Sequence, residues 1–364
     1  MSLSFTENRK NTRQVQVGDV NVGGHAPIAV QSMTNTHTSD VAKTVAQIKA
    51  LEAAGCEIIR VAVPDETSAA AISAIKRQIG IPLIADIHFD HRLAVMAAEN
   101  GADGLRINPG NIGSREKIQN VVDCANDRGL PIRIGVNAGS LEQDIMDSHH
   151  GPTADAMVES ALRHIDLLTA MQFDRIKVSL KASDVPRTIE AYRKLSTKVD
   201  FPLHLGVTEA GTIYPGIVKS SIGVGMLLAE GIGDTIRISL TSDPVNEIRV
   251  AYEILKALGI RRHGPELISC PTCGRCNIDL FDIANEIESF LLTKKTPIKV
   301  AIMGCVVNGP GEAREADIGV AGGNGVGILF KKGQVVKKFP QADLVTILKA
   351  EIELFEKTYN TSGI

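Results

Sequence analysis

The chain has 364 residues, of which 44% are hydrophobic, so it is long enough for two domains and can bury a sizeable core. Its net charge of −3 gives no basic excess for nucleic acid or an anionic membrane, and no apolar run approaches the ~20 residues of a transmembrane helix. The first residues show no apolar stretch after their basic side chains, so we expect no signal peptide and a cytoplasmic location.

From about residue 26 to residue 243 one unit recurs, a β-branched run with a polar end followed by an amphipathic helical stretch. The expected strands are 28–34, 57–63, 82–89, 104–110, 131–139, 175–183, 202–211 and 235–243. Strands that alternate with helices predict a parallel sheet, and eight strands close a (β/α)8 TIM-type barrel. An open doubly wound sheet is the alternative, but no Gly-x-Gly-x-x-Gly motif follows the first strand.

The composition changes after about residue 264, which indicates a second, smaller α/β domain. A turn with the sequence ISCPTCGRC is followed by an expected helix, the strand IKVAIMG and the loop CVVNGPGEA. Two more strands and a last amphipathic helix complete the chain. We therefore predict a barrel over residues 1–262 and a C-terminal domain over residues 263–364.

Charged and polar side chains recur at the ends of the expected barrel strands, where barrel enzymes place their active sites. They are Arg60, Asp86, His88, Arg106, Asn108, Arg133, Asn137, Lys177, Ser179, Lys181, His204, Glu209, Arg237 and Ser239. In R-I-N and R-I-G-V-N they are two or four positions apart, so strand geometry turns them to one face. Clustered cations would repel one another in an empty barrel, which predicts a multiply charged anion such as a diphosphate. Internal ion pairs are the alternative interpretation.

Four of the six cysteines have the spacing of metal ligands. They are Cys270, Cys273 and Cys276, in one C-x-x-C-x-x-C turn, and Cys305 at the start of a loop rich in Gly and Pro. In a reducing compartment they are expected to be thiols. Four thiolates could bind a structural zinc ion, but Cys305 lacks the close partner that zinc motifs usually provide. The spacing therefore favours an iron–sulfur cluster.

Motifs along nearly the whole chain resemble one enzyme family. They are VQSMTNT (30–36), ADIHFD (85–90), LRINPGNIG (105–113), IRIGVNAGSLE (132–142), KVSLKASD (177–184), LHLGVTEAG (203–211), CPTCGR (270–275) and GCVVNGPGEA (304–313). The family is that of the 4-hydroxy-3-methylbut-2-enyl diphosphate synthases of isoprenoid biosynthesis, in its two-domain bacterial form. Only the combination of these motifs is specific.

The resemblance implies a reaction, a cofactor and partners. The expected reaction is the two-electron reductive ring opening of 2-C-methyl-D-erythritol 2,4-cyclodiphosphate to 4-hydroxy-3-methylbut-2-enyl diphosphate, with loss of water. A 4Fe–4S cluster would deliver the electrons, which flavodoxin or ferredoxin would supply. The family also implies a homodimer, in which the cluster domain of one subunit reaches the barrel of the other.

The same resemblance implies residue roles. Cys270, Cys273, Cys305 and Glu312 are the expected cluster ligands, and Glu209 is the expected proton donor near the reacting carbons. A carboxylate ligand such as Glu312 is more exchangeable than a thiolate and so belongs with the catalytic residues. The substrate-binding residues that the resemblance implies are Arg60, Arg106, Asn108, Arg133, Asn137, Lys177, Ser179, His204, Arg237 and Ser239. Their position at a strand end adds Asp86 and His88 to the expected substrate-binding residues. The family uses no ligand at Cys276, although spacing alone would nominate it.

Two other functions compete with this one. The first is a barrel enzyme that binds a phosphorylated sugar and carries a structural zinc ion. Colour separates the two, because a zinc protein is colourless and an iron–sulfur protein is brown. The second is an electron-transfer protein without a substrate of its own, which leaves the cationic strand ends unexplained.

Overall fold

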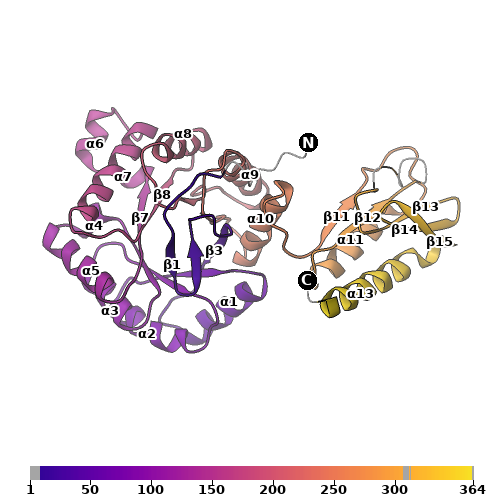
Figure 1. The fold of residues 1–364 in the computed structure, drawn as a ribbon, viewed down its shortest axis with the longest axis horizontal. Coiled ribbons are helices and arrows are strands. Elements are labelled where there is room, and N and C mark those ends of the chain that lie inside the picture. The colour runs from indigo at the N-terminus through magenta and orange to yellow at the C-terminus, as the bar shows by residue number, and fades with distance from the viewer. Residues whose placement is uncertain (1–8, 306–310, 312, 363–364) are drawn as a thin grey trace. The chain divides into compact units, whose positions relative to one another are not determined.

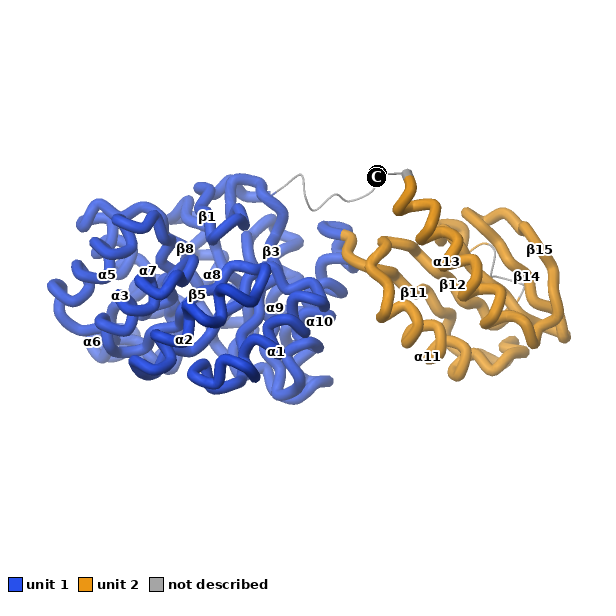
Figure 2. Tube along the Cα trace, turned by 90° about the horizontal axis from the view of Figure 1, so that it is seen from below, with its two compact units in different colours: residues 1–261 blue, residues 262–364 orange. Residues whose placement is uncertain are grey.

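The computed structural model describes residues 9–305, 311 and 313–362. The chain divides into two compact units, Met1–Arg261 and Arg262–Ile364, which Figure 2 shows in blue and orange. The sequence analysis places this boundary one residue later. Within the described part of the chain, no helix is long and apolar enough to cross a membrane.

The first unit is a closed barrel of eight parallel strands, so the alternative of an open sheet is wrong. The strands are β3 (Ala29–Met33), β4 (Ile58–Ala62), β5 (Leu83–Asp86), β6 (Gly104–Ile107), β7 (Ile132–Asn137), β8 (Ile176–Lys181), β9 (His204–Leu205) and β10 (Thr235–Ile236). Their order is β8-β7-β6-β5-β4-β3-β10-β9, and a parallel bridge between Val178 and Leu203 joins the two ends of this order. Strands β9 and β10 are much shorter than expected.

Helices surround the strands (Figure 1). They are α1 (Val41–Ala53), α2 (Glu66–Lys76), α3 (His91–Glu99), α4 (Pro109–Ile112), α5 (Arg115–Asp127), α6 (Gln143–Ser148), α7 (Ala154–Thr169), α8 (Val185–Ser196), α9 (Ile213–Ala229) and α10 (Pro244–Ala257). Most begin at an Asp, Ser or Thr whose side chain accepts a hydrogen bond from the first turn. Asp65, for example, accepts from Ser68 N at 2.7 Å. Such caps fix where each loop after a strand ends.

A hairpin that the sequence analysis missed covers the start of the barrel strands. It consists of β1 (Val15–Val17) and β2 (Val20–Val22), which pair antiparallel. Its valines pack against Ala29, Ile58 and Ile84, which lie at or near the beginnings of β3, β4 and β5. The hairpin closes this end with apolar contacts, and polar chemistry is left to the opposite end of the barrel.

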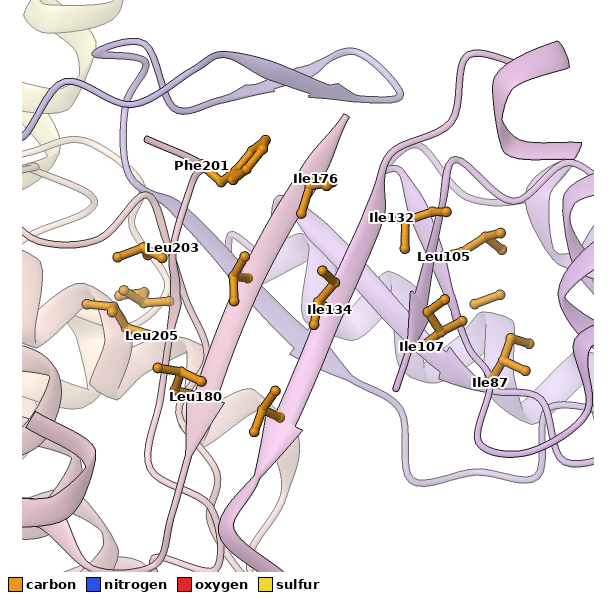
Figure 3. Packing of buried hydrophobic residues seen from close by; sticks show 14 of the residues in the cluster. Ile87, Leu105, Ile107, Ile132, Ile134, Ile176, Leu180, Phe201, Leu203 and Leu205 are labelled. Carbon is orange, nitrogen blue, oxygen red and sulfur yellow. The ribbon is translucent and has the colours of Figure 1, made fainter. Parts of the chain in front are cut away.

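The main core lies between the strands and the helices. Figure 3 shows its side chains on β6 to β9, among them Leu105, Ile107, Ile132 and Ile134. Side chains alternate along a strand, so the residues between these apolar ones point into the barrel. The interior positions are therefore Arg106 and its equivalents on the neighbouring strands.

The second unit is a five-stranded mixed sheet with two long helices. Its elements are β11 (Glu266–Ser269), α11 (Leu280–Leu291), β12 (Lys299–Met303), β13 (Ile318–Gly323), β14 (Val326–Lys331), β15 (Gln334–Pro340), η2 (Gln341–Asp343) and α13 (Leu344–Ser362). The strand order is β11-β12-β13-β14-β15, parallel from β11 to β13 and antiparallel from β13 to β15. Apolar residues of α11 and α13 pack on the sheet. The sequence analysis missed β11 and β15.

Candidate active site

Buried cations on three neighbouring strands lie at the same level of the barrel. Arg106 on β6 is in register with Arg133 on β7, which is in register with Lys177 on β8. Each alternates with apolar residues that face the helices, so all three side chains point inward. All three are less than a tenth exposed, as is Arg60 on β4. The strands thus bring together four cations predicted to bind substrate.

Asp86 lies among these cations at the end of β5. Its Oδ1 accepts a hydrogen bond from Arg106 Nη1 at 3.1 Å, and its Oδ2 lies 3.5 Å from Arg60 Nε. Burial would raise the pKa of this carboxyl, but the nearby Arg60, Arg106 and Arg133 outweigh burial and hold the pKa at about 2. Asp86 is therefore ionised and neutralises one positive charge. Its contacts are with the cations themselves, which supports a role in orienting them.

Many buried donors inside the barrel have no hydrogen-bond partner among the residues that the structure describes. They are Arg106 Nε, Arg133 Nε and Nη1, Lys177 Nζ, Lys181 Nζ, His204 Nε2 and Arg237 Nε. A buried donor without a partner costs about 1–3 kcal/mol. Ion pairing with Asp86 neutralises part of the charge of Arg60 and Arg106 but engages only Nη1 of Arg106. It leaves Arg133 and Lys177 without acceptors, which a ligand with several oxygen atoms would provide.

The pKa values show how unfavourable this concentration of charge is. Burial lowers the pKa of Lys177 to about 7, and it lowers that of Arg60 to about 10 despite the opposing effect of Asp86. Burial and then the neighbouring Arg133 also lower the pKa of Lys181 and of His204 well below their ordinary values. A polyanion in the barrel would restore the charged forms, so the electrostatics favour anion binding.

At two positions next to the buried cations the chain has glycine, and a larger side chain there would collide with a cation. A Cβ atom at Gly135 on β7 would lie 2.4 Å from Arg106 Nε. A Cβ atom at Gly206, just after β9, would lie 2.6 Å from Lys181 Nζ and 2.5 Å from the carbonyl oxygen of Arg237. Any larger residue at either position would displace a cation.

Polar residues predicted on β6 to β8 lie beside the cations. Asn108 is buried directly after β6, where its Oδ1 accepts a hydrogen bond from Gly110 N at 3.2 Å and caps α4. Asn137 is half-buried at the end of β7. Ser179 is buried on β8, with its Oγ donating to the carbonyl of Ile134 at 3.4 Å. The positions of all three agree with the predicted binding surface.

The predicted residues on β9 and directly after β10 also lie at this end of the barrel. His204 is buried, and its Nδ1 lies 2.8 Å from Thr235 Oγ1 in a hydrogen bond. Arg237 and Ser239 are half-buried, and Arg237 Nε lies 3.9 Å from Glu247 on α10. The remaining predicted residue, His88, is exposed in the loop after β5 beside an exposed Phe89.

Glu209 lies in the segment that follows β9, at the same end of the barrel. Its side chain is exposed, and its φ of 51° is in the left-handed region, which residues other than glycine rarely adopt. Such backbone strain persists where the surroundings impose it, and it gathers at functional sites. The position is compatible with a residue that approaches a ligand from the barrel mouth.

The expected substrate-binding residues leave out three supporting residues, one of which, Lys181, is named above only among the strand-end side chains. Lys181 is fully inside the barrel, and its spacing of four residues from Lys177 was the available signal. Tyr192 on α8 accepts a hydrogen bond from Leu180 N at 3.0 Å and donates one to the carbonyl of His204, so it links β8 to β9. Glu247 accepts from Ser32 Oγ at 3.1 Å. The last two positions have no sequence signal.

We expect Arg133→Ala to weaken substrate binding about tenfold to a hundredfold, because one charge-assisted hydrogen bond contributes about 1.5–3 kcal/mol. Isothermal titration with the cyclic diphosphate measures the effect. Arg193→Ala is the control, since Arg193 forms an exposed ion pair with Glu230 on the outside of the barrel. Equal affinity in Arg133→Ala and the parent would exclude Arg133 from the binding surface.

In the second unit, the cysteine turn lies next to the end of β12. Cys270 directly follows β11, and its Sγ accepts a hydrogen bond from Gly304 N at 3.2 Å. A Cβ atom at Gly304 would lie 2.6 Å from Cys276 Sγ, so the close approach requires glycine. Cys305 follows directly and is half-buried. The two segments predicted to supply ligands are therefore adjacent.

A cation accompanies the exposed thiols. Hydrogen bonds from the backbone and side chain of Arg275 lower the pKa of Cys273, and the positive charge of Arg275 also interacts with Cys305. Cys276 differs in its hydrogen bond, because its thiol donates to the carbonyl of Ile278 at 3.4 Å, while both Cys270 and Cys276 pack against the apolar core of this unit. The lowered pKa favours a thiolate at Cys273, the form that binds a metal.

Within the described ranges, no three His, Cys, Asp or Glu side chains converge as they would around a single metal ion. Thiolates that hold a cluster bind different iron atoms and are spread around it. The donors present are three thiols from adjacent segments, with a cation beside them. They are therefore the kind of ligands that hold an iron–sulfur cluster. Glu312, the predicted fourth ligand, lies outside the described residues.

Known proteins resemble the whole chain. The profile of the GcpE TIM-barrel domain matches residues 12–252, and that of the GcpE protein C-terminal domain matches residues 266–354. A protein of Geobacter sulfurreducens named 4-hydroxy-3-methylbut-2-en-1-yl diphosphate synthase (flavodoxin) is 59% identical over 95% of this chain and 98% of its own length. One of the same name from Anoxybacillus flavithermus is 58% identical over 99% of both. Dihydropteroate synthase of Yersinia pestis, by contrast, matches 68% of this chain and 97% of its own at 12% identity and a TM-score of 0.49.

Proposed function

The chain belongs to the GcpE family of 4-hydroxy-3-methylbut-2-en-1-yl diphosphate synthases, and from this premise we propose the reaction that it catalyses. It is an oxidoreductase of isoprenoid biosynthesis that opens the ring of 2-C-methyl-D-erythritol 2,4-cyclodiphosphate. Two electrons enter, a carbon–oxygen bond of the ring breaks, and a hydroxyl group leaves as water. The product is 4-hydroxy-3-methylbut-2-enyl diphosphate.

The observation that supports this function best is the set of buried donors without partners inside the barrel. Arg133 and Lys177 supply hydrogen bonds and positive charge to the diphosphate, and Asp86 orients Arg60 and Arg106 beside them. These contacts strengthen when ring opening places additional negative charge on the diphosphate oxygen, because the donors are already in position. The barrel residues thus bind the substrate and stabilise the leaving oxyanion.

Asn108, Asn137 and Ser179 would hydrogen-bond the ring and the phosphate oxygens from β6, β7 and β8. His204, whose burial and neighbouring cations keep it neutral, offers Nε2 to the same ligand. Glu209 lies at the mouth, where its carboxyl group would transfer a proton to the departing hydroxyl group. The ring is thereby held between fixed donors and a residue that can protonate the departing hydroxyl group.

We infer that the second unit holds a 4Fe–4S cluster. Its ligands are Cys270, Cys273 and Cys305, with Glu312 as the fourth, and the thiol contacts described above support the three cysteines. A bound cluster supplies electrons one at a time to the substrate. Thiolate ligands require a reducing compartment, which supports a cytoplasmic location. Flavodoxin, named in the titles of the relatives, or ferredoxin is the proposed electron donor.

The lowered pKa of Lys177 predicts a pH-dependent affinity. In the free protein this lysine has a pKa of about 7 and is mostly neutral at pH 8, whereas a diphosphate beside it raises the pKa again. Binding at pH 8 should therefore take up protons, and affinity should fall as the pH rises above 7. Titration calorimetry in two buffers with different ionisation enthalpies measures the uptake, which Lys177→Met should reduce. Equal heats in both buffers would contradict the prediction.

An apolar stripe on α9 supports the proposed homodimer. Tyr214, Val218, Ile222 and Met226 follow one another at intervals of four residues, so they lie on one face of the helix, and all are exposed by 42–84%. Contiguous apolar surface of this kind marks protein–protein interfaces. In a two-fold symmetric dimer, the same face of the second copy would cover it.

We expect Ile222→Lys to dissociate the dimer, because it places a charge in an apolar contact on both copies. Light scattering after size-exclusion chromatography measures the molar mass. Leu354→Lys is the matched control, since Leu354 is equally exposed on α13 of the other unit. A monomeric parent, or an unchanged dimer in the Ile222→Lys variant, would refute this interface.

Metal analysis separates the proposed function from a zinc-containing phosphosugar enzyme. The protein purified without oxygen should be brown, contain about four iron atoms per chain and no stoichiometric zinc, and lose its colour in air. A colourless protein with one zinc ion per chain would favour the zinc enzyme instead.

A further inference from the structure

A set of three polar side chains, two of them buried on a helix, connects that helix with two loops of the predicted substrate site. Ser160 and His164 are one helical turn apart on α7, and both are at least 97% buried. Residues four positions apart share one face of a helix, so both side chains are directed to the same place. Polar side chains at such positions usually serve a specific partner.

That partner is Glu142, in the loop between β7 and α6. Its Oε2 accepts a hydrogen bond from Ser160 Oγ at 2.7 Å, and its Oε1 lies 3.0 Å from His164 Nε2 in a bent contact. Glu142 is the N-cap residue of α6, yet its side chain makes no capping hydrogen bond there. The Glu142 carboxylate therefore contacts α7 and does not cap its own helix, α6. Burial opposes ionisation, but the contacts with His164 and Ser160 lower the pKa of Glu142 to about 2.

His164 also contacts the loop after β6. A Cβ atom at Gly110 would lie 3.4 Å from His164 Cε1, so the imidazole ring packs against the backbone of the first turn of α4. The amide nitrogen of Gly110 donates to Asn108 Oδ1 at 3.2 Å. The imidazole ring of His164 therefore contacts two loops. It packs against the backbone of the loop that carries Asn108, and it lies beside the Glu142 side chain of the loop that begins at Asn137.

We propose that Glu142, Ser160 and His164 form a brace that positions Asn108 and Asn137 for the substrate. The three are positioning residues, because they reach the ligand only through the two loops. An apolar group of similar size could stabilise the same helix contact, so stability alone does not require a half-buried carboxylate there. The carboxylate instead ties its own loop to Ser160 and His164 of α7, and His164 packs against the loop that carries Asn108, so the three residues fix the relative position of the two loops. This inference rests on the proposed function of the barrel site.

His164→Ala tests the brace, and Arg163→Ala is the matched control. Arg163 is the neighbouring residue on α7, and it pairs with Asp144 of α6 at 2.7 Å on the exposed side. The control thus removes an ion pair between the same two helices without touching the brace. In the full-length protein, His164→Ala should raise the KM for the cyclic diphosphate about tenfold, whereas Arg163→Ala should change it less than twofold. His164→Gln, which keeps a donor near Glu142, should recover most of the loss.

Hydrogen exchange of the purified protein without substrate gives a readout that is independent of the reaction. Residues 108–113 and 137–142 should both lose protection in His164→Ala and keep it in Arg163→Ala. If the parent enzyme does not convert the cyclic diphosphate, the proposed function is wrong. The hydrogen-exchange comparison then still tests the brace, because it does not depend on the reaction. If His164→Ala does not fold, Glu142→Gln takes its place, with the same expected result. Unchanged exchange in both loops, or an unchanged KM in a folded variant of an active parent, would overturn the proposal.

Discussion

Replacing Cys270, Cys273 or Cys305 by serine is expected to abolish the visible absorption of the cluster and all turnover. A serine hydroxyl is a much poorer ligand for iron than a thiolate, so a missing ligand destabilises the whole cluster. Absorption spectra, iron content and activity of the three variants, purified without oxygen, measure the effect. Retention of both colour and turnover in any one of them would remove that cysteine from the ligand set.

Cys276→Ser is the matched control for this series. Its thiol donates to the carbonyl of Ile278, and a serine hydroxyl can make the same hydrogen bond. We expect the variant to keep its cluster and most of its activity, whereas Glu312→Ala should lose most activity. The opposite pair of results would give the role of fourth ligand to Cys276.

Glu209→Gln is expected to slow turnover at least ~100-fold, the lower range for the loss of a general acid. The amide keeps the size of the side chain and cannot release a proton, so substrate affinity and the cluster spectrum should stay near those of the parent. A single-turnover experiment with chemically reduced protein isolates the ring-opening step from electron delivery by the donor.

The other explanation of Glu209 is that it only holds nearby cations in place. In that case the glutamine variant would bind the cyclic diphosphate more weakly and open the ring at nearly the parental rate. A near-parental rate in single turnover would therefore rule out proton donation, and reduced affinity alone would support the electrostatic role.

The barrel could be predicted from the sequence because each of its strands combines an apolar run with a polar end. This pattern is clear on β7 and β8, where Arg133 and Lys177 alternate with isoleucine and valine. Strands β9 and β10 contain only two residues each, because the chain leaves the ladder soon after His204 and Thr235. The polar residues that follow lie in loops, and a sequence pattern of period two does not show where pairing stops.

The missed strands are either very short or lack a buried face. Strand β15, QVVKKFP, is an edge strand on which all residues but Phe339 are exposed, so it has no buried face to predict. Strand β11 has four residues and joins the cysteine turn directly. The hairpin of β1 and β2 consists of two strands of three residues, and its valines are buried only because the barrel lies beneath them.

The charged half of the candidate site was predictable, and the residues that support it were not. Spacing of two along one strand identified Arg106 and Asn108 as residues of one face, and spacing of four did the same for Arg133 and Asn137. Nothing in the sequence connects Tyr192 with His204 or Glu142 with His164, because each contact depends on how a helix packs against a strand or a loop. The room that Gly135 leaves for Arg106 is likewise a property of the closed barrel.

Conversion of the cyclic diphosphate by the purified protein is the most direct test of the central claim. The protein is incubated without oxygen with 2-C-methyl-D-erythritol 2,4-cyclodiphosphate and reduced flavodoxin, and phosphorus NMR follows the substrate. The resonances of the cyclic diphosphate should give way to those of the linear 4-hydroxy-3-methylbut-2-enyl diphosphate, with two electrons consumed for each product molecule. The Cys270→Ser variant should leave the substrate unchanged. An unaltered spectrum with a parent protein that carries its full iron content would contradict the assignment.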